Sequence, residues 1–183
     1  ASIRRSGKVA ISLTDGDELI SVQFSSGNDE ILVAASSGKC IRFSENDVRA
    51  MGRDTQGVKS MDISDDDRVV DMIILDKNKK ILTVSSGGYG KRSSEEDYRL
   101  QQRAGKGIKA GVFSEKTGRL VNLKQVGEND DVMVITSNGI IIRMPSSEIS
   151  EFGRDTQGVR IMKMRGDGEV VCVAVVAREE QED

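Results

Sequence analysis

Basic side chains recur at matching positions along this chain, and they are the residues whose type and spacing could do chemistry. A first group follows glycine-ended apolar runs by four residues, and a second stands in and after a glycine-rich loop. The first group is Arg42, Lys91 and Arg143, with Arg92 next to Lys91; the second is Arg53, Arg103, Lys106, Arg154, Lys59, Lys109 and Arg160. Cations at regular intervals along one surface neutralise successive phosphates without reading a base sequence. The pattern therefore predicts a polyanionic partner.

The chemistry that the chain lacks narrows the function classes. It has no histidine, which excludes a His-dependent triad, a His-ligated metal or an imidazole base built from this chain alone. Cys40 and Cys172 are too few and too far apart for a Cys-rich zinc site, and we expect two free, buried thiols. Lys91 precedes Arg92 and Lys106 precedes Gly107, so neither lysine fits a P-loop. We expect no catalytic residue, no metal and no cofactor.

The distribution of charge matters more than its sum. The formal net charge is −3, which by itself argues against nucleic acid as a partner. Acidic residues, however, gather in turns at 15–17, 65–67 and 128–131 and at the end of the chain, 179–183. We therefore expect a basic rim and acidic faces, because local field and not net charge decides whether a polyanion binds.

The cations follow an internal repeat. The sequence GRDTQGV occurs at residues 52–58 and again, unchanged, at 153–159. A third copy near the midpoint keeps Arg103, Gly107 and a following Ile-Lys. Apolar pairs keep the same step of about 50 residues at 19–20, 69–70, 120–121 and 170–171. We expect repeats at about 7–56, 57–106 and 107–157, a partial copy at 158–178 and an acidic tail at 179–183.

Each repeat has the texture of short β-strands. Runs such as 69–75 and 81–84 are rich in branched residues and end at Asp, Asn or Gly turns, and helix is expected for about one turn at most, within 94–102. A unit of four such strands cannot bury both of its faces, so neighbouring units must stack. We predict an all-β, propeller-like array with an aliphatic core and about three to four blades of four strands. The longest apolar run, 170–177, is too short for a membrane span, and we expect no secretory signal, because no apolar stretch follows the basic residues at 4–5.

These motifs make the chain similar to a known family. GRDTQGV, the segment GGYGKR at 87–92 and the segment 95–107 resemble the blades of the C-terminal domain of bacterial type IIA topoisomerases, above all of DNA gyrase A. The resemblance covers essentially the whole chain. It implies a β-pinwheel, a propeller variant whose adjacent blades exchange strands. It also implies that double-stranded DNA binds to the rim of the domain and is bent there.

The resemblance extends to the gyrase box, the family's Gln-(Arg/Lys)-Arg-Gly-Gly-(Arg/Lys)-Gly motif for positive wrapping of DNA, with two departures. Gln102 replaces a basic residue and Ala104 replaces a glycine. The family keeps the intact box in its first blade, which would lie upstream. The resemblance therefore implies a degenerate box, made of Gln101, Gln102, Arg103, Ala104, Gly105, Lys106 and Gly107.

The function implied by the resemblance is that of a non-catalytic module. It would bind DNA without sequence preference, bend or wrap it, and so support ATP-dependent supercoiling by the holoenzyme. Its partners would be double-stranded DNA, the remainder of gyrase A and gyrase B, in the cytoplasm at the nucleoid and with no membrane. The family's catalytic tyrosine belongs to another domain, so Tyr89 and Tyr98 are interpreted as packing residues. The acidic tail would either be a disordered end or, as similar tails do in the family, compete with DNA for the basic rim.

Other interpretations of the same residues stay open. Arg42 and its equivalents could be solvated charges that protect a strand edge. Arg53 and its equivalents could pair with Asp54 or Asp155, or tie a loop carbonyl to the next blade. For the whole chain, the alternatives are the corresponding domain of topoisomerase IV, a protein-interaction propeller without a role in DNA, and an enzyme on a propeller scaffold.

Overall fold

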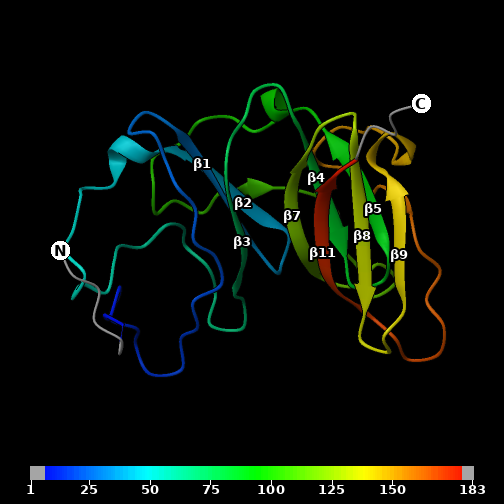
Figure 1. The fold of residues 1–183 in the computed structure, drawn as a ribbon, viewed down its shortest axis with the longest axis horizontal. Coiled ribbons are helices and arrows are strands. Elements are labelled where there is room, and N and C mark those ends of the chain that lie inside the picture. Colours follow the sequence, from blue (N-terminus) through cyan, green and yellow to red (C-terminus); the bar gives the residue numbers. More distant parts are fainter. Residues whose placement is uncertain (1–6, 179–183) are drawn as a thin grey trace.

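The computed structural model describes residues 7–178, which form three antiparallel β-sheets that lie side by side (Figure 1). We call these sheets blades A, B and C. In spatial order, blade A consists of β3 (Val69–Ile74), β1 (Glu30–Ala35), β2 (Lys39–Ser44) and β6 (Ile108–Lys109). Blade B consists of β7 (Leu120–Val126), β4 (Lys80–Ser85), β5 (Tyr89–Ser93) and β10 (Val159–Arg160). Blade C consists of β11 (Val170–Ala177), β8 (Asp130–Thr136) and β9 (Ile141–Pro145).

Blades A and B each combine strands from three successive repeats. A hairpin from one repeat, β1–β2 or β4–β5, forms the centre of the blade. The next repeat supplies the strand that pairs with the first strand of the hairpin, β3 in blade A and β7 in blade B. The repeat after that supplies the two-residue strand at the other edge, β6 in blade A and β10 in blade B. Neighbouring blades are therefore interlocked by the chain itself. The predicted all-β, propeller-like fold is confirmed.

A glycine in the left-handed region of backbone space closes the turn of each central hairpin. Gly38, Gly88 and Gly139 have φ angles of 85°, 77° and 79°. At Gly88 a side chain is excluded by space as well, since a Cβ atom there would lie 2.4 Å from the carbonyl oxygen of Met162. The glycine lets a tight turn join the two strands, and the turn fixes which residues face each other across the hairpin.

Aliphatic side chains fill the spaces between the blades, as the composition predicted. One cluster, between blades A and B, includes Leu32, Ile73, Ile81, Leu120 and Leu123, together with the completely buried ring of Tyr98. A second cluster, between blades B and C, includes Leu82, Val84, Val132, Val134 and Val173. Complete burial of one such aliphatic side chain contributes about 1.5–3 kcal/mol, so these contacts hold the blades in fixed relative positions.

The helical segments within residues 7–178 are three short 3-10 turns, η1 (Glu45–Asp47), η2 (Glu95–Asp97) and η3 (Ser146–Glu148). Each follows the second strand of a hairpin, and η2 is the single turn expected within 94–102. No helix in this part of the chain has the length and apolar character to cross a membrane. Both cysteines are free, as expected, but only Cys40 is buried. The expectation for Cys172 is wrong because this residue lies on an exposed part of β11, beside a register shift.

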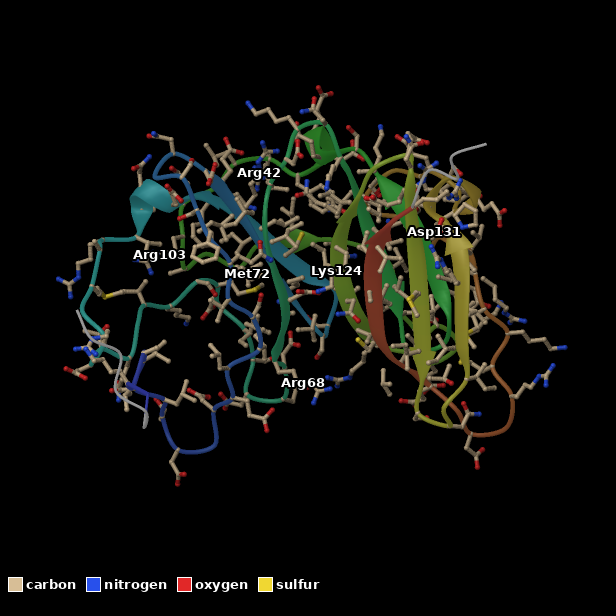
Figure 2. The ribbon with its side chains drawn as sticks, viewed as in Figure 1. Arg42, Arg68, Met72, Arg103, Lys124 and Asp131 are labelled. Carbon is tan, nitrogen blue, oxygen red and sulfur yellow. The ribbon has the colours of Figure 1, made fainter. Side chains whose placement is uncertain are left out.

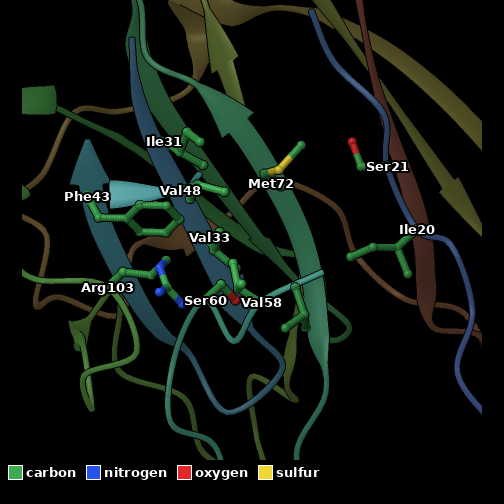
Figure 3. Close-up of a pocket in the computed structure, with 11 residues that line it drawn as sticks. Ile20, Ser21, Ile31, Val33, Phe43, Val48, Val58, Ser60, Met72 and Arg103 are labelled. Carbon is green, nitrogen blue, oxygen red and sulfur yellow. The ribbon is translucent and has the colours of Figure 1, made fainter. Parts of the chain in front are cut away.

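Residues 7–28 contain no strand, although they carry the repeat pattern. Val22 and Phe24, which correspond to Met72 and Ile74 of β3 by the repeat, are 79% and 102% exposed. A cavity of about 280 Å³ opens beside this segment, lined mainly by apolar residues. Figure 3 shows Ile20 standing across this cavity from Phe43 of the central hairpin. The first repeat therefore leaves apolar surface that the later repeats cover.

Candidate nucleic-acid interface

The strand register identifies which basic residues are equivalent. Arg42 lies opposite Leu32, Arg92 lies opposite Leu82 and Arg143 lies opposite Met133, at the same height in blades A, B and C. Lys91 is one residue out of step and points to the other face of its strand, since successive side chains alternate. Its equivalents are Ile41 and Ile142. The spacing of four residues after a glycine, used in the sequence analysis, therefore grouped Lys91 wrongly with Arg42 and Arg143. The residue equivalent to these two arginines is Arg92.

Arg42 and Arg92 lie inside the molecule, and the expectation that they stand exposed on an outer strand is wrong. Arg42 donates to the carboxylate of Glu95 at 2.7 Å and to the carbonyl of Tyr98 at 2.9 Å, and it pairs with Glu30. Arg92 donates to the carbonyl of Ile149 at 2.7 Å and to Glu128 at 2.9 Å. The cause is the segment that follows the hairpin of the next blade, which crosses over the arginine and forms a parallel bridge with it, through Leu100 at Arg42 and through Glu151 at Arg92. Both arginines hold that segment in place.

Arg143 occupies the same position in blade C but has a different environment. Its side chain is 56% exposed and pairs with Asp131 at 2.8 Å, an aspartate that also binds Arg178 at 2.7 Å. Arg178, followed by Arg143, lowers the pKa of Asp131. Both positive charges are thus shared with one carboxylate, which weakens the field that Arg143 presents to solvent.

Lys91 is buried, with 1% of its surface exposed, and it binds the second GRDTQGV loop. Its ammonium donates to the carbonyls of Gly153 and Thr156 at 2.9 and 2.8 Å, and to the carbonyl of Arg154. Burial lowers the pKa of Lys91 to about 8, against an opposing effect of Asp155. The expectation that Lys91 stands on the rim is therefore wrong, because its donors are occupied by three loop carbonyls.

The loop arginines Arg103 and Arg154 tie one blade to the next. Arg154 donates to the carbonyl of Asp97 at 3.1 Å and to that of Lys109. Arg103 repeats the arrangement with the carbonyls of Asp47, at 3.3 Å, and Lys59. Both side chains therefore tie a loop carbonyl to the next blade, which is the alternative interpretation that the sequence left open for Arg53 and its equivalents. Arg53, from the first copy, is exposed and makes no such bond within residues 7–178.

One group of exposed basic residues lies where a two-residue outer strand meets the turn end of a hairpin. In blade A, Lys109 of β6 lies opposite Lys39 of β2. Lys59, Lys106 and Lys39 also surround Asp62, whose pKa is lowered first by its bond to Lys59 and more weakly by the other two lysines. We call Lys39, Lys59, Lys106 and Lys109 the blade A edge.

Blade B has a matching arrangement around an aromatic ring. Arg160 of β10 lies opposite Tyr89 of β5, and the ammonium of Lys116 lies 6.0 Å from the centre of the same ring. We call Tyr89, Lys116 and Arg160 the blade B edge. The sequence analysis missed Lys39 and Lys116. Lys39 directly follows the turn glycine, so a search for cations next to that glycine finds it, whereas Lys116 lies in a turn whose repeat equivalents are not basic.

A buried carboxylate sets the position of blade B relative to blade A. Asp71 of β3 is 3% exposed and accepts from the side chain of Asn122 at 3.0 Å and from the backbone N–H of Leu123 at 3.2 Å. Lys124 completes its shell at 3.0 Å. In Figure 2, Lys124 lies where β7 faces β3, between the parts of the molecule that hold Arg42 and Asp131. Because this junction is polar and satisfied, the two basic edges keep a fixed relative position.

Comparison with known proteins agrees with this architecture. The family model described as DNA gyrase C-terminal domain, beta-propeller, matches residues 1–26, 29–76, 79–126 and 130–177. The DNA gyrase A protein of Halalkalibacterium halodurans is 60% identical over 182 residues, which are 100% of this chain and 22% of that protein. The DNA gyrase A protein of Escherichia coli K12 is 41% identical over 181 residues, 99% of this chain and 21% of that protein. The chain thus spans about a fifth of the length of these relatives.

Two solved structures share the fold. A DNA gyrase A C-terminal domain superposes with a TM-score of 0.85 at 26% identity and covers 93% of this chain and 58% of its own. The C-terminal domain of DNA topoisomerase IV superposes with a TM-score of 0.91 at 21% identity, covering 98% and 56%. At that identity the second likeness shows the fold alone. From the four matched segments and the gyrase relatives, the chain belongs to the DNA gyrase A C-terminal domain family.

Proposed function

We propose that this chain is a non-catalytic module that binds and bends double-stranded DNA without sequence preference. The observation that carries the proposal is the pair of exposed basic edges on adjacent, interlocked blades. A duplex that crosses both edges meets cations from each blade in turn, and their contacts offset the cost of bending, which is about 1–6 kcal/mol for a short site. The contacts proposed are those of Lys59, Lys106, Lys109 and Arg160, with Arg53 and Arg143 at the two ends.

The buried cations have a different part in this proposal. Arg42, Arg92 and Lys91 hold the chain segments that carry the exposed cations, and Arg103 and Arg154 hold the loops between blades. Within the degenerate box at 101–107, we therefore expect Lys106 to contact DNA, whereas Arg103 binds loop carbonyls and holds the loop in place. The proposed acidic tail, 179–183, lies outside the described residues.

In its biological setting, the module would act with the remainder of gyrase A and with gyrase B, at the nucleoid in the bacterial cytoplasm. It would present a curved DNA segment to the parts of the holoenzyme that cut and pass DNA, and so support ATP-dependent supercoiling. The identity of 60% to a gyrase A protein favours this assignment over a topoisomerase IV origin.

The test is a titration of the chain with linear duplexes of increasing length at two salt concentrations. We expect affinity to rise with length until the duplex spans both edges, and to fall steeply with salt, because phosphate contacts release counterions. Replacing Lys59, Lys106 and Lys109 together by Gln should lower the slope of log affinity against log salt by about 3. If the duplex affinity changes neither with salt nor with this triple replacement, the proposal is wrong and a protein-interaction propeller is favoured.

A further inference from the structure

Tyr89 of the blade B edge gathers two cations around its hydroxyl group. Arg160 donates from Nη2 to the phenol oxygen at 3.0 Å, and its guanidinium carbon lies 5.4 Å from the ring centre. Lys116 reaches the same ring from the following turn, with Nζ at 6.0 Å from the centre. The ring is nearly covered, with 8% exposed, whereas both cations are exposed. A rigid aromatic ring therefore holds two flexible basic side chains together at the surface.

These two cations have no acidic partner in the part of the chain that the structure describes. The ion pairs found within residues 7–178 include neither Lys116 nor Arg160. Their effect is seen on the phenol, since hydrogen bonding from Arg160, and then the charges of Arg160 and Lys116, lower the pKa of Tyr89. The surroundings of the hydroxyl thus favour a negative charge that no described carboxylate supplies.

We propose that Tyr89, Lys116 and Arg160 form a binding site for one phosphate group of the nucleic-acid backbone. This inference rests on the proposed function and names one of its contact points. A guanidinium donates through two parallel N–H groups to phosphate oxygens, an ammonium adds a point charge, and the phenol O–H adds a third donor. Because the ring already restrains both cations, less side-chain entropy is lost when the phosphate binds.

The site depends on strand exchange, because its three residues come from three successive repeats. Tyr89 lies on the central hairpin of blade B, Lys116 lies in the turn before β7, and Arg160 lies on the outer strand β10. A phosphate bound there contacts all three segments, so its binding requires the assembled blade.

Blade A provides an internal contrast. Its residues at the same three positions are Lys39, Asp66 and Lys109, so an acid replaces Lys116 and a second lysine replaces the aromatic ring. Asp66 lies 4.0 Å from Arg119, the residue before β7, so this turn of blade A carries an acid with a cationic partner and not an unpaired cation. The three-donor site is therefore specific to blade B, whereas blade A offers a looser group of lysines.

The test follows the ring resonances of the tyrosines by NMR at neutral pH and low salt. The chain has two tyrosines, and the completely buried Tyr98 serves as the internal reference. We expect inorganic phosphate, and separately a duplex of about 12 base pairs, to shift the signals of Tyr89 but not those of Tyr98. Arg160→Gln should weaken the response of Tyr89 to phosphate, and Arg160→Lys should restore part of it.

Duplex affinity gives the second measurement. Arg160→Gln and Lys116→Gln should each weaken duplex binding about 3- to 10-fold and lower the salt slope by about 1. Lys77→Gln is the matched control, because Lys77 is an exposed lysine at the opposite end of strand β4, and it should leave the Tyr89 response unchanged. Unchanged Tyr98 signals show that each variant is folded.

The outcomes separate this site from the proposed function. If the duplex binds with normal affinity to Arg160→Gln and the Tyr89 signals never move, the phosphate site is wrong and the DNA-binding function stands. If the duplex fails to bind at low salt, the proposed function is wrong, and the titration with inorganic phosphate alone decides the site. A shift of Tyr89 with phosphate but not with duplex would assign the site to free phosphate and not to DNA.

Discussion

The two copies of GRDTQGV have the same seven residues and different structures. In the copy at 153–159, three carbonyls accept from Lys91, and the chain continues as strand β10 against β5. The copy at 52–58 leads into no strand, and its Arg53 and Val58 are exposed. The difference is that a hairpin lies against the second loop, whereas no hairpin within residues 7–178 lies against the first. The loop is ordered by a neighbouring blade and not by its own sequence.

The middle loop, 101–107, shows that a loop and its hairpin are matched in chemistry. Blade A has Ile41 where blade B has Lys91, and its loop has Gly105 where the other loop has Thr156. A Cβ on Gly105 would lie 3.6 Å from the Cδ1 atom of Ile41, whereas Thr156 gives Lys91 a carbonyl at 2.8 Å and a hydroxyl at 3.3 Å. An apolar pair in blade A thus replaces a polar pair in blade B.

Amide hydrogen exchange should show the largest difference between the two copies. The N–H of Ile161 donates to the carbonyl of Gly88 at 2.9 Å, and the N–H of Ala110 donates to that of Gly38 at 2.7 Å. The equivalent N–H of Ser60 lies beyond the first copy, where no hairpin within residues 7–178 faces the loop. We expect the first two amides to exchange at least about 100-fold more slowly than that of Ser60. Equal rates would mean that the first copy is ordered without a neighbouring hairpin.

Removal of the Lys91 ammonium should destabilise the chain. Lys91→Met leaves three loop carbonyls without their donor, and we expect the free energy of unfolding to fall by about 1–3 kcal/mol. Chemical denaturation measures the change. Lys77→Met, at an exposed turn, is the control and should change it by no more than about 0.5 kcal/mol. A Lys91→Met protein as stable as the parent would show that water replaces the ammonium without loss.

A double replacement tests whether loop and hairpin are matched. Lys91→Ile with Thr156→Gly gives blade B the pair found in blade A. We expect the double variant to be more stable, by about 0.5–1 kcal/mol, than the sum of the two single effects predicts. Additive losses would instead indicate that the two residues act independently.

A pH dependence of stability should also come from Lys91. Its pKa is about 8 in the folded chain and near its ordinary value of 10.5 when unfolded. Between these values the unfolded chain holds a proton that the folded chain has released, so the contribution of Lys91 to the free energy of unfolding rises with pH. The stability difference between the parent and Lys91→Met should therefore widen from pH 8 toward pH 10.5 and stay constant below pH 8. A difference that shrinks over this range would contradict the assignment.

The sequence by itself determined the repeat, the β class, the aliphatic core and the family. These follow from spacing and composition, which are properties of the chain alone: GRDTQGV recurs at one step, and branched residues alternate within short runs. Sequence also located most of the cations of the two edges, Lys59, Lys106, Lys109 and Arg160, because each stands in or just after a glycine-rich loop.

Only the tertiary structure decided which cations are free. Arg42 and Arg143 occupy one position of the repeat, yet Arg42 is covered by the segment that follows the hairpin of the next blade, and Arg143 is half exposed. Lys91 and Arg92 are neighbours in sequence and bind different segments, one a loop and the other a turn. The physical reason is strand exchange: what covers a side chain here comes from another repeat, about 50 residues or more away, and local spacing carries no information about it.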